Sequence, residues 1–173
     1  IITDHHKSED VLPDVDIIVN PNKIGDNYPF KGICGTTVIY KLLLQLAKEQ
    51  FPDVLSKFEQ YIDFVGLATV ADVMPVLEEN RVYIKEALNI FNAESKFKLR
   101  YGWISLIQEL LLRKRISKDR IFTETDFGFI FAPIMNAQSR VHGSANVAID
   151  TFLSLNTEDI REKANYLVGI NEK

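Results

Sequence analysis

The sequence Ile1-Ile2-Thr3-Asp4-His5-His6 joins a short β-prone run to a carboxylate and two adjacent imidazoles. A strand that ends in this way presents its polar side chains at the carboxyl edge of a sheet, where α/β proteins place their ligand sites. A second β-prone run, residues 16–20, lies between Pro13 and Pro21 and predicts a neighbouring strand. The start of the chain therefore predicts an α/β fold that begins with short strands of a parallel sheet.

The rest of the chain is predicted to be mostly helical, after a loop at residues 22–32. Residues 123–131 stay open between strand and helix, because their phenylalanines alternate whereas residues 123–126 are typical of a helix start. Apolar residues at helical spacing indicate the other helices at residues 35–50, 54–71, 80–92, 102–113, 145–154 and 157–171.

The histidine pair is the first candidate site. Neutral imidazole is a common ligand of divalent metals, and a neighbouring carboxylate such as Asp4 can fix the tautomer of that ligand. In the turn after a strand, one ring of His5-His6 can face a metal while the other faces a substrate. The opposing interpretation is that His5 and His6 are ordinary histidines of the surface or the core. The two histidines by themselves do not decide between this interpretation and a metal site.

Asp72 is the second candidate, because it interrupts the apolar stretch Gly66–Val76. A buried carboxylate needs a metal, a cation or several donors nearby. The alternative is that Asp72 caps a helix that starts near Pro75. Residue chemistry leaves the two interpretations evenly balanced.

The third candidate is the stretch Asn136–Arg140, which follows an apolar segment and is predicted to be a polar turn. The planar guanidinium of Arg140 matches two phosphate oxygens at once. Most arginines at such positions cap a carbonyl or pair with an acid, so phosphate binding and ordinary pairing both stay open here.

The order of these motifs resembles the DHH phosphoesterase family. Asp4-His5-His6 is followed by Gly35 at the start of an apolar helix, by Gly66–Pro75 with Asn80-Arg81 after it, and by Asn136–Arg140. Within the family the sequence is similar to the bacterial exonucleases that degrade single-stranded DNA from 5′ to 3′, over nearly the whole chain. The resemblance implies part of a metal-dependent enzyme that hydrolyses phosphodiester bonds in DNA repair and recombination.

The resemblance also implies roles at the metal centre. His5 and Asp72 would be ligands of Mn²⁺ or Mg²⁺, and Asp4 would orient the histidines from outside the coordination sphere. His6 would be the catalytic residue that faces the scissile phosphate, stabilising its charge or helping to protonate the leaving group.

Further residues are implied to bind DNA. Arg140 would hold a substrate phosphate, Asn136 would shape the adjoining turn, and Arg81 would contact DNA or pair with carboxylates of the site, unless it only starts a helix. The sequence departs from many relatives at Ser139, where they have glycine, and at Ile134, where they often have arginine. These departures predict a different position for the segment before Arg140.

The family has further motifs that residues 1–173 do not contain. They are aspartate motifs upstream of Asp-His-His and a glycine-rich nucleic-acid-binding domain downstream. We therefore expect residues 1–173 to be a partial DHH domain. Two ligands do not balance the four positive charges of two metal ions, so the isolated chain is expected to bind metal weakly and to be nearly inactive.

Composition fits an ordinary globular domain. The chain has 173 residues, is 46% hydrophobic and carries a net charge of −4, which argues against a generic basic nucleic-acid coat. Cys34 is the one cysteine, so a reducing cytoplasm is the expected compartment. No apolar run approaches membrane-spanning length, and no membrane association is expected.

Basic residues gather between Lys96 and Arg120, with Tyr101 and Trp103 among them. This pattern fits one wall of a channel for single-stranded DNA. It also fits a solvated helix face with Trp103 in the core, which is the preferred interpretation.

Three functions remain. The first is the exonuclease, with single-stranded DNA as substrate and a single-strand-binding protein or helicase as partner. The second is a non-catalytic replication or repair scaffold with the same fold, which has no reason to keep His5, His6 and Asp72 together. The third is a smaller DHH phosphoesterase that acts on oligonucleotides or cyclic dinucleotides, which the Asn136–Arg140 motif disfavours.

Overall fold

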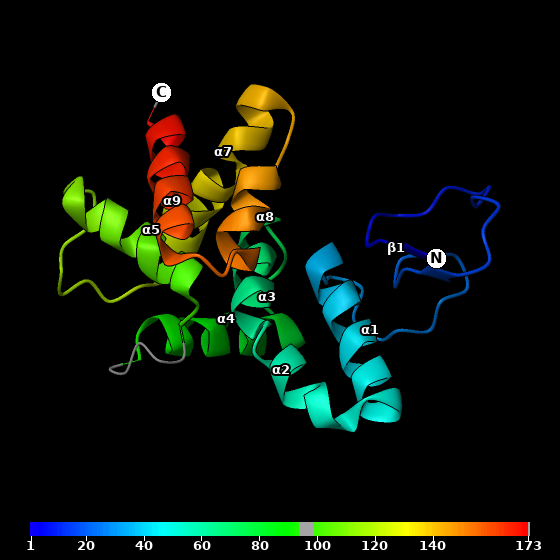
Figure 1. Ribbon diagram of the computed structural model, residues 1–173. Coiled ribbons are helices and arrows are strands. Elements are labelled where there is room, and N and C mark those ends of the chain that lie inside the picture. The colour runs from blue at the N-terminus through cyan, green and yellow to red at the C-terminus, as the bar shows by residue number, and fades with distance from the viewer. Residues whose placement is uncertain (94–98, 173) are drawn as a thin grey trace. The chain divides into compact units, whose positions relative to one another are not determined.

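The computed structural model describes residues 1–93 and 99–172 of the chain (Figure 1). The chain divides into two compact units, Ile1–Leu88 and Asn89–Lys173. The assignment of both units to one partial DHH domain stays a prediction. Within the described residues, no helix combines the length and the apolar composition needed to cross a bilayer.

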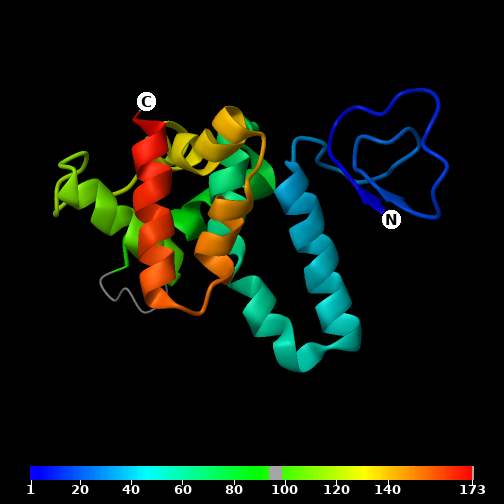
Figure 2. The ribbon, with the colours of Figure 1, turned by 45° about the horizontal axis from the view of Figure 1, so that its top comes forward.

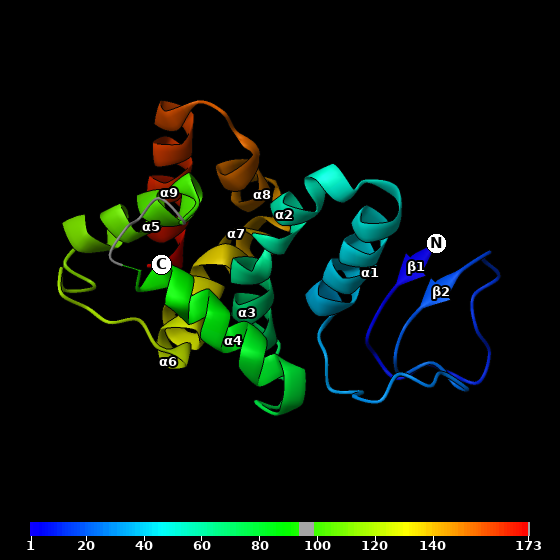
Figure 3. The same ribbon diagram turned by 90° about the horizontal axis from the view of Figure 1, so that it is seen from below.

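The first unit begins with a two-stranded parallel sheet. Its strands are β1 (Ile2–Thr3) and β2 (Ile18–Val19), which lie side by side and point the same way (Figure 3). The backbone N–H of Asp4 donates to the carbonyl of Val19 at 3.1 Å, so the ladder continues into the Asp-His-His turn. The predicted short parallel strands are confirmed. Because the strands end at one edge, the polar residues that follow them meet there.

Helices form the rest of this unit. The predicted helix at 54–71 is broken at Gln60 and Tyr61, where the N–H of Tyr61 bonds to the carbonyl of Phe58 at 3.0 Å. Aromatic residues spaced by three suit such a tight turn, and apolar spacing alone did not reveal the break. The elements are α1 (Gly35–Gln50), η1 (Pro52–Val54), α2 (Leu55–Glu59), α3 (Ile62–Ala71) and most of α4 (Glu78–Phe91).

Gly66 lets α3 approach α4 closely. A Cβ atom at this position would lie 2.3 Å from the Cβ of Ala87 and 2.8 Å from the carbonyl oxygen of Tyr83. Only glycine permits this contact without displacing backbone. The close packing holds the middle of α3, the helix that Asp72 ends, against the middle of α4.

The second unit is helical. Helix α9 packs against α5, α7 and α8, and Figures 1 and 2 show α8 beside it and α5 crossing it at an angle. The elements are α5 (Tyr101–Leu112), α6 (Glu124–Asp126), the π-helical η3 (Phe127–Phe131), α7 (Ala132–His142), α8 (Asn146–Leu153) and α9 (Thr157–Asn171). The predicted mostly helical remainder is therefore confirmed.

Buried aromatic rings form the core of the second unit. Phe91 lies among four of them, with ring centroids 4.9 to 5.9 Å away and tilted or edge-on geometry. Its neighbours are Trp103, Phe122, Phe127 and Phe131. Trp103 thus belongs to the core, as the preferred interpretation of the sequence held.

Residues 123–131, left open by the sequence, are helical. Thr123 and Asp126 form a capping box that starts α6, and the buried carboxylate of Asp126 also accepts a hydrogen bond from Nε of Arg120 at 2.9 Å. In the π-helix that follows, Phe127 and Phe131 point into the core while Phe129 is exposed. The alternation of phenylalanines therefore reflects one buried face of a helix and not a strand.

Candidate metal centre

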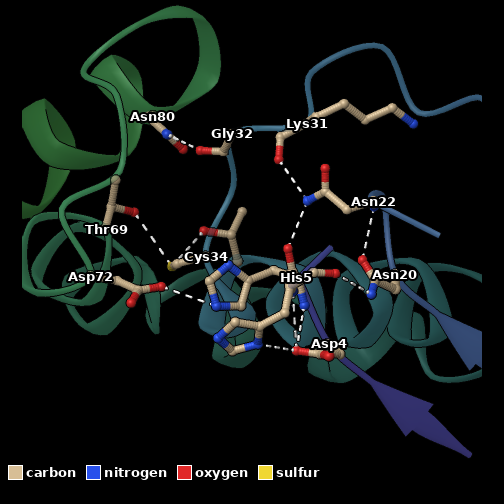
Figure 4. A network of polar contacts seen from close by, with 12 residues as sticks. Asp4, His5, Asn20, Asn22, Lys31, Gly32, Cys34, Thr69, Asp72 and Asn80 are labelled. Atoms are coloured by element: carbon tan, nitrogen blue, oxygen red, sulfur yellow. Dashed lines mark hydrogen bonds and ion pairs between the residues drawn. The ribbon is translucent and has the colours of Figure 1, made fainter. Parts of the chain in front are cut away.

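His5 and Asp72 face each other at the edge of the first unit. His5 follows β1 and Asp72 ends α3, and Nε2 of His5 lies 3.2 Å from Oδ2 of Asp72 (Figure 4). The His5 side chain is 13% exposed and the Asp72 side chain 44% exposed. The fold thus brings together the two residues that the sequence nominated as metal ligands.

The separation of these two atoms fits a shared divalent ion. Ligand atoms bound at about 2.1 Å lie roughly 3.0 Å apart at a right angle and roughly 3.4 Å apart at a tetrahedral angle. The observed 3.2 Å lies between these values. Ligand atoms of Asp4, His5 and His6 also lie within 4.8 Å of one another. An imidazole nitrogen beside carboxylate oxygens is a donor set that suits Mn²⁺ and its neighbours.

Asp4 organises the Asp-His-His turn. Its Oδ1 accepts hydrogen bonds from the backbone N–H of His5 at 2.7 Å and of His6 at 3.3 Å, and it lies 2.7 Å from Nδ1 of His6. The hydrogen bond to Asp4 raises the pKa of His6, and the same bond lowers the pKa of Asp4. Asp4 thus orients the ring of His6 and the backbone of His5, and the His6 side chain stays 76% exposed.

Two asparagines after β2 support the turn from the other strand. Nδ2 of Asn20 donates to the carbonyl of His6 at 2.8 Å, and Nδ2 of Asn22 donates to the carbonyl of His5 at 2.7 Å (Figure 4). Sequence analysis assigned neither residue a role. The available signal was their position at the carboxyl end of a strand that runs parallel to the strand before Asp4.

Asp72 lies in a tight helix end. The N–H of Met74 bonds to the carbonyl of Thr69 at 3.0 Å, and the N–H of Val73 bonds to the carbonyl of Val70 at 3.1 Å. This pair of bonds is a Schellman motif, whose left-handed residue is usually glycine. Here that residue is Val73, with φ of 56°. A β-branched residue in this region is strained.

The structure corrects the expected surroundings of Asp72. The carboxylate is not buried among its apolar neighbours but is 44% exposed. It also ends α3 and does not cap the next helix, because α4 starts only at Glu78. The exposed segment that follows Asp72 carries apolar side chains outward, which is why an apolar sequence does not bury the carboxylate here.

A second polar cluster lies beside α1 and α4 in the same unit. Glu79 accepts hydrogen bonds from Nζ of Lys41 at 2.7 Å, from the hydroxyl of Tyr83 at 2.9 Å and from the hydroxyl of Tyr28. Burial opposes ionisation of Glu79, but the three donors outweigh burial and lower its pKa. Burial and the bond to Glu79 raise the pKa of Tyr83 to about 12. Glu79 is therefore held as an anion.

Arg81 and the Asn136–Arg140 segment make none of the contacts described above. Arg81 is exposed in the first turn of α4 and has no ion pair among the described residues. Asn136 and Arg140 lie in α7 and not in a turn, because the helix continues to Gly143, whose φ of 68° ends it. Asn136 and Arg140 are one helical turn apart, both exposed, and so share a face. Their predicted roles are not tested by these contacts.

Several residues of the basic segment are engaged within the second unit. Nη1 of Arg115 donates to Oδ1 of Asn171 at 3.1 Å, and Arg113 bonds to Asn165 on α9. Lys96 and Lys98 lie outside the described residues. The described arginines therefore support the interpretation of a helix face better than that of an open channel wall.

Comparison with known proteins points to one group of enzymes. No protein-family model matches the chain. The chain is 29% identical over 178 residues to the single-stranded-DNA-specific exonuclease RecJ of Haemophilus influenzae, covering 99% of this chain and 29% of that protein. It is 31% identical over 175 residues to RecJ of Bacillus subtilis, covering 100% of this chain and 20% of that protein. The chain thus spans less than a third of these curated relatives.

Solved structures agree with this similarity. The crystal structure of RecJ in complex with Mn²⁺ from Thermus thermophilus matches 96% of this chain and 23% of that chain, with a TM-score of 0.71 and 25% identity. A crystal structure of exonuclease RecJ bound to manganese matches 98% of this chain and 39% of that chain, with a TM-score of 0.68 and 27% identity. The chain is therefore homologous along its length to one segment of the RecJ exonucleases and has the fold of that segment.

Proposed function

We propose that this chain supplies part of the active site of a divalent-metal-dependent exonuclease that degrades single-stranded DNA from 5′ to 3′. The observation that carries the proposal is the pair of His5 Nε2 and Asp72 Oδ2, 3.2 Å apart, beside a histidine oriented by Asp4. Similarity to RecJ along the whole chain supports the choice of substrate.

His5 and Asp72 would hold a Mn²⁺ or Mg²⁺ ion, and the complete enzyme would hold two ions. When bound, such an ion polarises a phosphoryl oxygen and lowers the pKa of bound water. Asp72 is well suited to this role because much of its side-chain surface is open while its backbone is fixed by the helix end. The small exposure of the His5 side chain limits the orientations of that ring.

His6 would act on the scissile phosphate. Asp4 lies 2.7 Å from Nδ1 of His6 and orients the ring. Nε2 of this exposed side chain would then donate a proton to the leaving oxygen or stabilise charge on the phosphate. Asp4 would keep the ring in the orientation that this transfer needs.

Arg140 would bind a phosphate of the DNA, with Asn136 on the same face of α7 and Arg81 as a further contact. All three side chains are exposed. Arginine forks match phosphate oxygens bidentately. A recess of about 280 Å³ touches Asp4, but neither histidine nor Asp72 lines it, so it carries no part of this proposal.

The remaining parts of the site would come from segments outside these residues. Two ligands do not neutralise two divalent ions, so we expect residues 1–173 alone to bind Mn²⁺ weakly and to turn over little DNA. The full-length protein would act in the reducing cytoplasm. Its partner would be a single-strand-binding protein or a helicase.

The test uses a full-length protein that contains these residues, with Mn²⁺ and single-stranded DNA labelled at one end or the other. We expect release of mononucleotides from the 5′ end and little cleavage of duplex DNA. His6→Ala is expected to lower kcat by about 100-fold or more, as loss of a proton donor does. His5→Ala and Asp72→Ala are expected to lower Mn²⁺ affinity as well as activity.

His142→Ala is the matched control, because His142 is the exposed last residue of α7. It is expected to leave kcat unchanged. Unchanged activity in His6→Ala would contradict the catalytic role of His6. Binding of single-stranded DNA without any cleavage would favour a scaffold, and cleavage of only short oligonucleotides or cyclic dinucleotides would favour a smaller phosphoesterase.

A further inference from the structure

His5 and Asp72 belong to segments that are distant in sequence, yet their side chains must hold a fixed separation if they share an ion. His5 lies in the turn after β1, and Asp72 lies in the helix end of α3. The strand ladder fixes only the first of these segments, and the Schellman motif fixes only the second. Helix α1 packs against both β1 and α3, and contacts closer to the two side chains can set the distance between them more exactly.

Asn80 ties the Asp72 turn to Gly32. Its side chain is fully buried, and Nδ2 donates to the carbonyl of Gly32 at 2.7 Å and to the carbonyl of Pro75 at 2.9 Å. Pro75 lies against Gly32 so closely that a Cβ atom on Gly32 would be 2.7 Å from Cγ of Pro75. The turn that carries Asp72 is thus locked to Gly32 by one amide and one close contact.

Asn22 ties the His5 turn to Lys31, the residue before Gly32. Its Nδ2 donates to the carbonyl of His5 at 2.7 Å and to the carbonyl of Lys31 at 3.0 Å. Figure 4 shows the resulting series, in which the adjacent carbonyls of Lys31 and Gly32 each accept a bond from a different asparagine. The series connects the backbone of His5 to that of Pro75.

We infer that Asn22 and Asn80 are positioning residues that set the separation between the side chains of His5 and Asp72. The inference rests on the proposed function, because it assigns these two amides to the metal centre. Both amides bond to backbone carbonyls and would act on the metal only through His5 and Asp72. Groups outside the coordination sphere that orient ligands change metal affinity by about 10-fold to 100-fold when they are removed.

A purely structural role is the alternative, because buried asparagines often satisfy carbonyls of irregular backbone. The second unit supplies a control asparagine. Nδ2 of Asn92 donates to the carbonyl of Phe122 at 2.8 Å, and its Oδ1 accepts from the N–H of Phe122 at 2.7 Å. Asn92 is exposed and pairs with a single residue, but its amide also connects two segments, in the unit that does not contain His5 and Asp72.

The experiment measures Mn²⁺ affinity and thermal stability of a full-length protein that contains these residues. Isothermal calorimetry gives the Kd, and the electron paramagnetic resonance spectrum reports the symmetry of bound Mn²⁺. We expect Asn80→Ala and Asn22→Ala to raise the Kd about 10-fold or more and to alter the spectrum. Because the two amides act in series, the double variant is expected to lose less than the product of the single effects.

Asn92→Ala is expected to lower the melting temperature without changing the Kd. Excess Mn²⁺ is expected to restore most of the turnover of Asn80→Ala but none of that of His6→Ala. Should Asn80→Ala fail to fold, Gly32→Ala provides the second test, because it displaces Pro75 while leaving the amide in place. It is also expected to raise the Kd.

The measured Kd values separate failure of the positioning role from failure of the proposed function. An unchanged Kd and spectrum in Asn22→Ala and in either Asn80→Ala or Gly32→Ala would overturn the positioning role while the proposed function stands. An unchanged Kd in His5→Ala and Asp72→Ala would overturn the proposed function itself, and the positioning role with it.

Discussion

Replacing Val73 with glycine is expected to stabilise the protein and to weaken its affinity for Mn²⁺. Val73 has φ of 56° at the left-handed position of the Schellman motif that follows Asp72, and its side chain is 87% exposed. Glycine adopts this conformation without a steric penalty. The strain of Val73 therefore lies directly beside a proposed metal ligand.

The size of the stability change follows from three contributions. Removing the valine side chain from a left-handed backbone conformation stabilises the folded state by about 1 to 2 kcal/mol. The greater flexibility of unfolded glycine costs about 0.5 to 1 kcal/mol, and the small buried part of the valine costs about 0.3 kcal/mol. The net stabilisation is about 0.5 kcal/mol, or roughly 1 to 2 °C in melting temperature for a protein of this length.

Two control variants separate strain from other effects. Lys114 has φ of 58° in the equivalent motif at the end of α5, so Lys114→Gly is expected to stabilise by a similar amount. Val82 is 55% exposed in the interior of α4, so Val82→Gly is expected to destabilise by about 1 kcal/mol. Urea denaturation followed by circular dichroism measures all three.

The metal affinity gives the second part of the prediction. Glycine frees the backbone next to Asp72, so Val73→Gly is expected to raise the Kd for Mn²⁺ while Lys114→Gly leaves it unchanged. Destabilisation by Val73→Gly alongside stabilisation by Lys114→Gly would refute the assignment of strain. An unchanged Kd in Val73→Gly would refute the link between that strain and the ligand.

Three further predictions concern other parts of the chain. The pKa of Glu79 is lowered, so its stabilising effect is present above the ordinary carboxyl pKa of 4.5 and is lost as pH falls below it. Glu79→Gln should therefore flatten the decline of the urea midpoint below about pH 4.5. If the urea midpoint of Glu79→Gln declines below pH 4.5 as steeply as that of the wild type, Glu79 is not the group responsible. Asp126→Ala should cost about 3 kcal/mol in urea denaturation, because it removes a buried partner and a cap, whereas the exposed Asp119→Ala should cost almost nothing. Equal losses of stability in Asp126→Ala and Asp119→Ala would exclude the capping box and ion pair of Asp126 as the cause. Arg140→Ala should weaken binding of single-stranded DNA and lower the slope of log affinity against log salt concentration by about one released counterion. Arg161→Ala removes an exposed arginine of α9 and should change neither quantity. Fluorescence anisotropy over a series of salt concentrations measures both, and equal slopes would remove Arg140 from the DNA site.

The fold was predictable where the sequence pattern is local. The paired β-prone runs predicted the parallel strands, and apolar spacing predicted most helices. It did not predict the break at Gln60 and Tyr61 or the helical state of Asn136–Arg140, because polar residues on one exposed helix face resemble a turn.

The site was predictable only in part. Physical reasoning left Asp72 balanced between a metal ligand and a helix cap, and only the family resemblance joined it to His5. The asparagines Asn22 and Asn80 were not found as contributors, because their role depends on two carbonyls at residues 31–32 that the sequence does not place near either ligand. Pairings of this kind are properties of the folded chain.

The most direct test of the account is the position of Mn²⁺ in crystals of a full-length protein that contains these residues. Anomalous diffraction collected at the manganese absorption edge locates the ion without reference to activity. The account predicts a peak within bonding distance of both Nε2 of His5 and Oδ2 of Asp72. Manganese bound elsewhere in the protein, with His5 and Asp72 still paired directly to each other, would contradict it.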